Sequence, residues 1–142
     1  MQLTLFTDFA LRALMRLAGE PGRSFSTIEI AGEFGISRNH LAKVVRDLAG
    51  SGFITTQRGV GGGFTLARPA QSITVGEVVR ALEGHELVEC FRADGGNCVL
   101  QPRCRLKTKL AAAREAFMRE LDATTLAECA YPPSARLSPA LA

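Results

Sequence analysis

The sequence has few of the residue patterns that mark an enzyme. His40 and His85 lie far apart, and no two of the four cysteines form a CxxC pair. No Lys-Ser or Lys-Thr pair follows the glycine cluster at residues 59–63, which excludes a nucleotide-binding P-loop. Because no catalytic constellation is evident, we expect no enzymatic activity, and a small redox enzyme is the least favoured alternative.

Long apolar runs are also missing. The most apolar stretch, residues 3–18, is interrupted by Asp8, Arg12 and Arg16, and no basic segment precedes it. Neither a signal peptide nor a membrane span fits this pattern, so we expect a cytoplasmic protein without membrane contacts. In a reducing compartment disulfides are disfavoured. With 46% hydrophobic and 22% charged residues, the chain has the composition of an ordinary folded domain, which excludes disorder.

The positive charge is concentrated in one part of the chain. The formal net charge is +3, and residues 81–142 are balanced, so the whole excess lies in residues 1–80. The imbalance is sharpest over residues 37–68, where Asp47 is the only acidic residue. A local basic excess of this kind indicates a polyanionic partner. The basic residues of this stretch are Arg38, Lys43, Arg46, Arg58 and Arg68.

Helical spacing of apolar residues predicts three helices in the first third of the chain. The first runs over about residues 7–19 from a cap at Thr7. The second opens at a capping box, in which Ser26 and Glu29 each accept the other's backbone N–H. The third is capped by Ser37 and ends near residue 51. Because only a tight turn at residues 35–36 separates the second helix from the third, the pair predicts a helix-turn-helix.

Strands and further helices follow. Strand formers at residues 53–56 and 64–67 flank the glycine-rich residues 58–63 and predict a β-hairpin, or wing. Thr74 with Glu77 forms a second capping box, and Thr125 with Glu128 predicts a short last helix. Pro102 can start a long helix with apolar residues every three or four positions. This stripe comprises Leu106, Leu110, Ala113, Phe117 and Leu121.

The predicted fold is therefore mainly α with a small β-hairpin. Residues 1–83 form a winged helix-turn-helix domain for DNA binding, and residues 84–103 an irregular loop that contains cysteines. Residues 104–130 form the long C-terminal helix and a short last helix. Residues 131–142 are a disordered tail.

The third helix carries the side chains that suit the major groove of double-stranded DNA. Its first turn reads Ser37, Arg38, Asn39, His40, and Arg and Asn can each form two hydrogen bonds with a base edge. A merely solvated helix face is the alternative. Further along the helix and on the wing, the candidate DNA contacts are Lys43, Arg46, Arg58, Gly61 and Gly62.

Three cysteines with the spacing Cys90-x7-Cys98-x5-Cys104 indicate a metal or redox site. Zinc usually takes close CxxC pairs, whereas thiolates spread along a loop can reach different irons of an iron–sulfur cluster, which needs a fourth ligand from elsewhere. Zinc binding, a thiol switch and plain structural cysteines stay open as alternatives. His85 is a minor candidate for the fourth ligand, and Cys129 is expected to be a buried apolar residue.

Four segments together resemble the BadM/Rrf-type winged-helix regulators over about residues 1–130. These segments are residues 1–14, the helix start at 37–43, the wing at 58–67 and the three-cysteine loop. The nitric-oxide-sensing repressors of that family are the members most similar to this sequence. The resemblance implies a homodimeric transcription factor that pairs through its long helix, with an iron–sulfur cluster controlling its affinity for a DNA operator.

The resemblance also implies a set of cluster ligands. Cys90, Cys98 and Cys104 match the three cluster cysteines, and Asp8 of the partner subunit matches the acidic fourth ligand of the nitric-oxide-sensing members. Lys107 stands where the iron–sulfur biogenesis regulator has a histidine. The resemblance favours a 4Fe–4S cluster. A 2Fe–2S cluster stays open as the alternative, because the gap between Cys90 and Cys98 is longer than the corresponding gap in the family. It implies nitric oxide as the signal.

Overall fold

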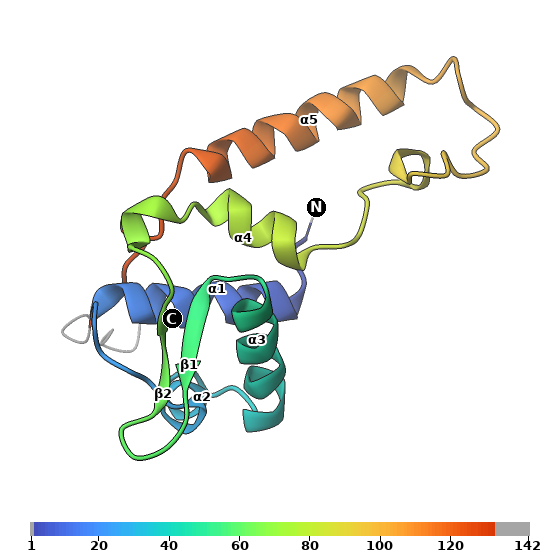
Figure 1. Ribbon diagram of the computed structural model, residues 1–142. Coiled ribbons are helices and arrows are strands. Elements are labelled where there is room, and N and C mark those ends of the chain that lie inside the picture. The colour runs from blue at the N-terminus through green and yellow to red at the C-terminus, as the bar shows by residue number, and fades with distance from the viewer. Residues whose placement is uncertain (1, 133–142) are drawn as a thin grey trace, which may run out of the picture.

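The computed structural model describes residues 2–132 and confirms the mainly α fold (Figure 1). Within this range a two-stranded antiparallel hairpin lies among five α-helices, with short 3-10 turns at Ala70–Ser72 and Glu89–Phe91. None of the helices in the described range is long and apolar enough to cross a membrane. The elements are α1 (Leu5–Gly19), α2 (Thr27–Phe34), α3 (Arg38–Gly50), β1 (Ile54–Gln57), β2 (Gly63–Leu66), α4 (Val75–Leu82) and α5 (Arg105–Asp122).

Local capping determines where the helices of the first domain begin. The predicted capping boxes at the starts of α2 and α4 are both present, and the Ser37 hydroxyl caps α3. The predicted start of α1 is wrong. Thr4 is the cap, and its hydroxyl accepts the backbone N–H of Thr7 at 3.2 Å. Thr7 cannot be the cap because it lies inside the helix and is fully buried.

Backbone conformation and backbone hydrogen bonds fix the turn after α2 and the wing. Gly35 ends α2 in the left-handed region at φ 64°, which a residue with a Cβ adopts only at a cost. In the hairpin, Ile54 pairs with Leu66 and Gln57 with Gly63. Strand β2 of the wing is also bonded to the segment between α1 and α2, because Phe25 and Phe64 exchange backbone hydrogen bonds of 3.0 and 2.8 Å.

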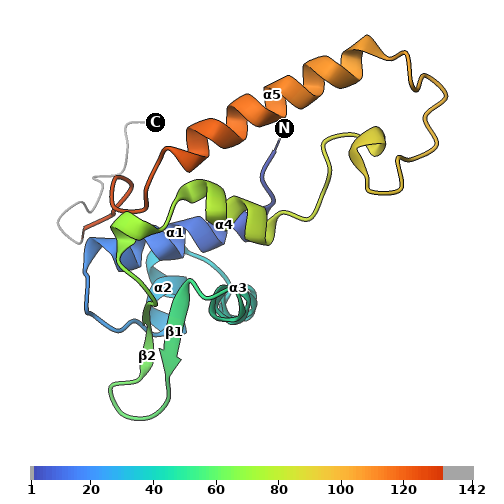
Figure 2. The ribbon, with the colours of Figure 1, turned by 45° about the horizontal axis from the view of Figure 1, so that its top comes forward.

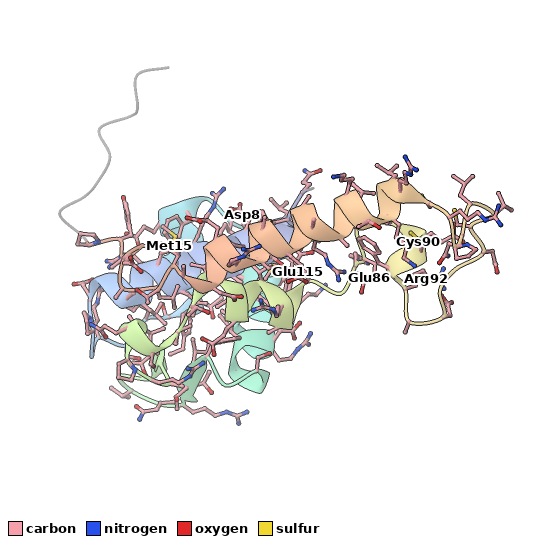
Figure 3. All side chains as sticks on the ribbon, turned by 90° about the horizontal axis from the view of Figure 1, so that it is seen from above. Asp8, Met15, Glu86, Cys90, Arg92 and Glu115 are labelled. Atoms are coloured by element: carbon pink, nitrogen blue, oxygen red, sulfur yellow. The ribbon has the colours of Figure 1, made fainter. Side chains whose placement is uncertain are left out.

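Helix α5 lies along α4, on the side of the molecule opposite to α3 and the wing (Figures 1 and 2). The C-terminal end of α5 is fixed by an ion pair between Arg80 and Asp122. A Cβ added to Gly76 would lie 2.0 Å from the Asp122 carboxylate, so the two helices approach closely here. The loop between α4 and α5 projects from the body of the molecule and carries Cys90, as Figure 3 shows.

Two predicted features of the C-terminal part are wrong. Helix α5 begins at Arg105, not at Pro102, with Cys104 at the N-cap. Thr125 and Glu128 do make the hydrogen bonds of a capping box, but only a turn follows, because Leu126 donates its N–H to Ile73 and is fully buried in the core. Of the tail predicted over residues 131–142, residues 133–142 lie outside the described range. Tyr131 binds the Met15 carbonyl through its N–H at 2.9 Å.

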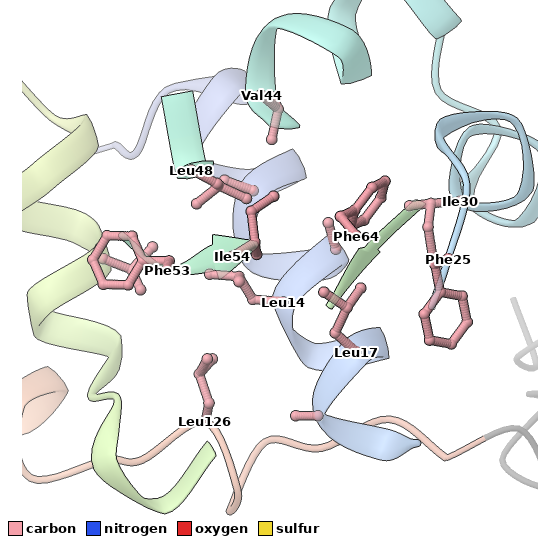
Figure 4. Packing of buried hydrophobic residues seen from close by; sticks show 14 of the residues in the cluster. Leu14, Leu17, Phe25, Ile30, Val44, Leu48, Phe53, Ile54, Phe64 and Leu126 are labelled. Carbon is pink, nitrogen blue, oxygen red and sulfur yellow. The ribbon is translucent and has the colours of Figure 1, made fainter. Parts of the chain in front are cut away.

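Helix α1 is the centre of the hydrophobic core (Figure 4). It contacts α3, α4 and β2, and it buries Ala10, Ala13, Leu14 and Leu17 almost completely. Because all these elements pack on one helix, α3, the wing strand β2 and α4 share a single core. The residues of the core drawn in Figure 4 include Leu14, Leu17, Phe25, Ile30, Val44, Leu48, Phe53, Ile54, Phe64 and Leu126.

Candidate nucleic-acid interface and cysteine loop

The first turn of α3 presents a free polar surface. The Ser37 hydroxyl accepts the backbone N–H of His40 at 3.2 Å, which fixes the turn. Among the described residues, the side chains of Arg38, Asn39, His40 and Lys43 are exposed and form no hydrogen bond or ion pair. Side chains without internal partners can bind a ligand without first breaking a contact. The turn therefore presents donors and acceptors in the arrangement that major-groove readout needs.

Two of the basic residues between positions 37 and 68 have partners within the chain. Arg46 lies 3.4 Å from Asp47, and its side chain is 75% exposed, so this contact is weak. Arg68 has a structural role: it donates to the Ser72 carbonyl at 2.7 Å and to Glu77 at 3.1 Å. The basic surface available to a polyanion is thus smaller than the sequence count suggested.

The wing lies at the same end of the molecule as α3 (Figure 1). Arg58 is exposed, and the tip turns through Gly59 and Gly61, which have φ values of 99° and 73°. A Cβ added to Gly62 would come within 2.6 Å of the Gln57 carbonyl, so the turn requires a glycine there. Sequence reasoning did not single out Val60, which is fully exposed at the tip between two glycines.

The cysteine loop holds three free thiols. Cys90 lies in the short turn Glu89–Phe91, Cys98 in an irregular segment, and Cys104 at the cap of α5, each partly buried. In residues 2–132 no three His, Cys, Asp or Glu side chains stand close enough together to hold a metal ion. The donor set itself suits an iron–sulfur cluster, because three thiols on one loop are typical iron ligands. The structure thus puts the three cysteines on one loop without gathering their side chains into a site.

The other candidate ligands lie elsewhere. Asp8 is on α1, forms an ion pair of 2.6 Å with Arg12, and is well separated from Cys90 in Figure 3. His85 lies at the exposed start of the loop. Within one chain the structure therefore does not bring Asp8 to the cysteines. Cys129 is partly buried in the turn after Leu126, less deeply than expected.

The start of α1 is tied to the end of α4. Glu83 accepts hydrogen bonds from the N–H and hydroxyl of Thr4 at 2.7 and 2.9 Å. Burial alone would raise the pKa of Glu83, but hydrogen bonds from Thr7 and Thr4 outweigh it and hold the pKa below its ordinary value. Glu83 also lines a cavity of about 780 Å³ between α4, α5 and the N-terminal residues.

Comparison with known proteins decides the class of this molecule. Residues 3–131 match the Rrf2 family, which is described as iron-dependent transcriptional regulators. The chain belongs to the Rrf2 family. Rrf2 membership makes the chain a DNA-binding transcriptional regulator and confirms the family resemblance seen in the sequence.

Solved structures of Rrf2-like regulators have the same fold. Staphylococcus aureus CymR in its oxidized form is 27% identical, with 92% of this chain and 96% of that chain covered and a TM-score of 0.72. CymR of B. subtilis, called the global cysteine regulator, is 27% identical over the same shares, with a TM-score of 0.75. T. potens IscR is 25% identical over 90% of this chain and 85% of that chain, with a TM-score of 0.71.

Proposed function

We propose that this Rrf2 regulator is a homodimeric repressor that senses nitric oxide through an iron–sulfur cluster. The cluster ligands are Cys90, Cys98, Cys104 and Asp8 of the partner subunit, as the similarity to the nitric-oxide-sensing repressor NsrR suggests. The observation that carries the proposal is the position of all three cysteines on one loop directly attached to α5. The description of the family as iron-dependent supports it.

Helix α5 supports a dimer. None of its residues is buried, although it carries an apolar stripe, and Leu106 is 62% exposed. An 18-residue helix is about 27 Å long. An apolar stripe of that length that is at most half-buried within one chain favours burial against the same helix of a second copy about a two-fold axis. Each copy then puts α3 into a major groove, with half-sites about 34–36 Å apart.

The ligand set explains the choice of signal. If a cluster is bound, Asp8 would hold its iron more weakly than a thiolate does, so the iron held by Asp8 would be the one most open to a small molecule. To reach the loop of the other subunit, Asp8 has to leave its ion pair with Arg12. Both side chains of this pair are about 40–45% exposed, so breaking it costs little.

A continuous set of contacts joins the loop to the reading elements. Cys104 lies at the N-cap position of α5, α5 packs on α4, α4 packs on α1, and α1 packs on α3. A tenfold change in operator affinity needs only about 1.4 kcal/mol, which a small change in the spacing of two reading helices can supply.

The decisive experiment is purification without oxygen, followed by visible spectroscopy and assays of iron and sulfide. We expect a coloured protein whose chromophore and operator binding are both lost on exposure to nitric oxide. Cys98→Ala should remove the chromophore and the control of operator binding together, whereas Cys129→Ala should keep both. Colourless wild-type protein, or a Cys98→Ala variant with an unchanged spectrum, would contradict the proposal.

The reading helix is tested with DNA. Arg38→Ala or Asn39→Ala should weaken binding to operator DNA by about 1–3 kcal/mol and binding to random DNA far less. Arg119→Ala, an exposed residue of α5 at the opposite side of the molecule and away from the cysteines, is the matched control and should leave both affinities unchanged. Equal losses on the two DNAs would show that Arg38 and Asn39 contact only phosphates.

A thiol switch without a cluster is the second candidate. Two of the similar structures are CymR proteins, one of them in an oxidized form, and the three thiols here stand apart as free cysteines. In that case anaerobic protein has no iron, and an oxidant changes operator binding through the cysteines alone. Thiol titration before and after oxidation, next to the iron assay, distinguishes the two candidates. Stoichiometric zinc would instead indicate a zinc-stabilised regulator.

A further inference from the structure

One arginine of α5 holds the part of the loop that surrounds Cys90. The Arg114 guanidinium forms an ion pair with Glu86 and stacks over the ring of Phe91, with 4.8 Å between the guanidinium carbon and the ring centroid. Glu86 precedes Cys90 by four residues, and Phe91 follows it directly. In Figure 3, Glu86 and Cys90 lie along the segment that leads from α4 into the projecting loop.

The other half of the loop has its own attachment. Lys107 of α5 donates to the Gln101 side chain at 2.8 Å, and Gln101 donates to the Gly95 carbonyl at 2.6 Å. The remaining side-chain hydrogen bonds of residues 89–97 stay within the loop, as when Glu89 accepts the N–H of Asn97 at 2.7 Å. Within the described residues, the side-chain polar contacts between α5 and the Cys90 half of the loop are therefore those of Arg114.

We propose that Arg114 is a positioning residue that fixes Cys90 relative to α5 and transmits a change at this thiol to the helix. Its planar guanidinium can satisfy the Glu86 carboxylate at one edge while its face covers the Phe91 ring, which a lysine ammonium cannot do in the same way. Because Phe91 is bonded to Cys90, any displacement of Cys90 by a ligand or by oxidation moves the ring under Arg114. The transmission to DNA rests on the proposed sensory role of the loop, but the positioning of Cys90 does not.

The test of the positioning uses metal-free, reduced full-length protein. Iodoacetamide alkylation of each cysteine is followed by mass spectrometry, and Cys129 of the same chain is the internal reference. Arg114→Ala should raise the rate at Cys90 about three- to tenfold relative to Cys129, as expected for the loss of one exposed ion pair and one cation–π contact. Arg119→Ala, an exposed arginine of α5 without a side-chain partner in the described range, is the matched control and should change neither rate.

A conservative variant and a binding assay separate positioning from general loosening. Arg114→Lys keeps the charge and should give an intermediate rate at Cys90. An unchanged Cys90 rate in Arg114→Ala, or an equal rise at Cys90 and Cys129, would overturn the proposal. In operator binding, alkylation should change the affinity of the Arg119→Ala protein more than that of Arg114→Ala. If the protein lacks iron but Arg114→Ala raises the alkylation rate at Cys90 as expected, the cluster proposal fails while the positioning role of Arg114 stands.

Discussion

The contact between Gly76 and the end of α5 gives the sharpest test of how α5 is held. A Cβ at position 76 would lie 2.0 Å from the Asp122 carboxylate oxygen and 3.0 Å from the Asp122 backbone nitrogen. The carboxylate can turn away only by leaving Arg80, and the backbone contact requires α5 itself to shift. Gly76→Ala therefore disturbs the junction between the cysteine-bearing part of the chain and the reading domain.

A second helical glycine provides the control for magnitude. Gly32 is exposed in α2, and a Cβ there would meet no atom within 4 Å. Gly32→Ala should stabilise the protein by up to about 1 kcal/mol, because alanine has the higher helix propensity. Gly76→Ala gains a similar stabilisation from helix propensity, but its added methyl group is forced against Asp122, which costs about 1–3 kcal/mol. We expect Gly76→Ala to be less stable than Gly32→Ala by about 1–3 kcal/mol.

Thermal and urea unfolding at one fixed protein concentration measure this difference, because dimerisation would make both concentration-dependent. At roughly 4 °C per kcal/mol for a chain of this size, Gly76→Ala should melt about 4–12 °C below Gly32→Ala. A Gly76→Ala protein as stable as Gly32→Ala would refute the close approach of α4 and α5.

Two further predictions concern the reading helix and the α1–α4 contact. Ser37→Ala removes the cap of α3 and should cost about 0.5–2 kcal/mol in urea unfolding and weaken operator binding, whereas Ser51→Ala, at the far end of α3, should do neither. Glu83→Gln tests the carboxylate that binds Thr4. The pKa of Glu83 in the folded protein lies below its ordinary value of 4.5. The stabilising contribution of this carboxylate is therefore present above pH 4.5 and is lost as the pH falls through the folded pKa. The difference in unfolding free energy between wild type and Glu83→Gln should therefore be largest at neutral pH and shrink in acid, and a difference independent of pH would contradict the assignment.

Features encoded by neighbouring residues were predictable from the sequence. The capping boxes of Ser26 with Glu29 and of Thr74 with Glu77 form as expected, because each needs only four consecutive residues. The hairpin follows equally from strand formers on both sides of a glycine cluster.

Features that depend on distant contacts were not predictable. Thr125 and Glu128 have the same local pattern as the true capping boxes, but backbone bonds from this segment to Ile73 and Ala70 replace the helix. Arg16 interrupts an apolar stretch, and a charged residue is normally expected at the surface. Its side chain is nevertheless only 4% exposed and forms ion pairs with Glu20 and Glu33. For the cysteine loop, spacing identifies the donors but not their arrangement, since an irregular loop has no periodicity from which positions follow.

The two backbone hydrogen bonds between Phe25 and Phe64 limit how the wing can move relative to the rest of the DNA-binding domain. They tie the hairpin to the polypeptide entering α2, and β1 also contacts α3, so the hairpin and the reading helix belong to one packed unit. If an effector acts at the far side of the molecule, as proposed, we expect it to reorient each reading head as a rigid body. In a dimer, switching would lie in the distance and angle between two unchanged heads, which solution scattering with and without the effector can measure.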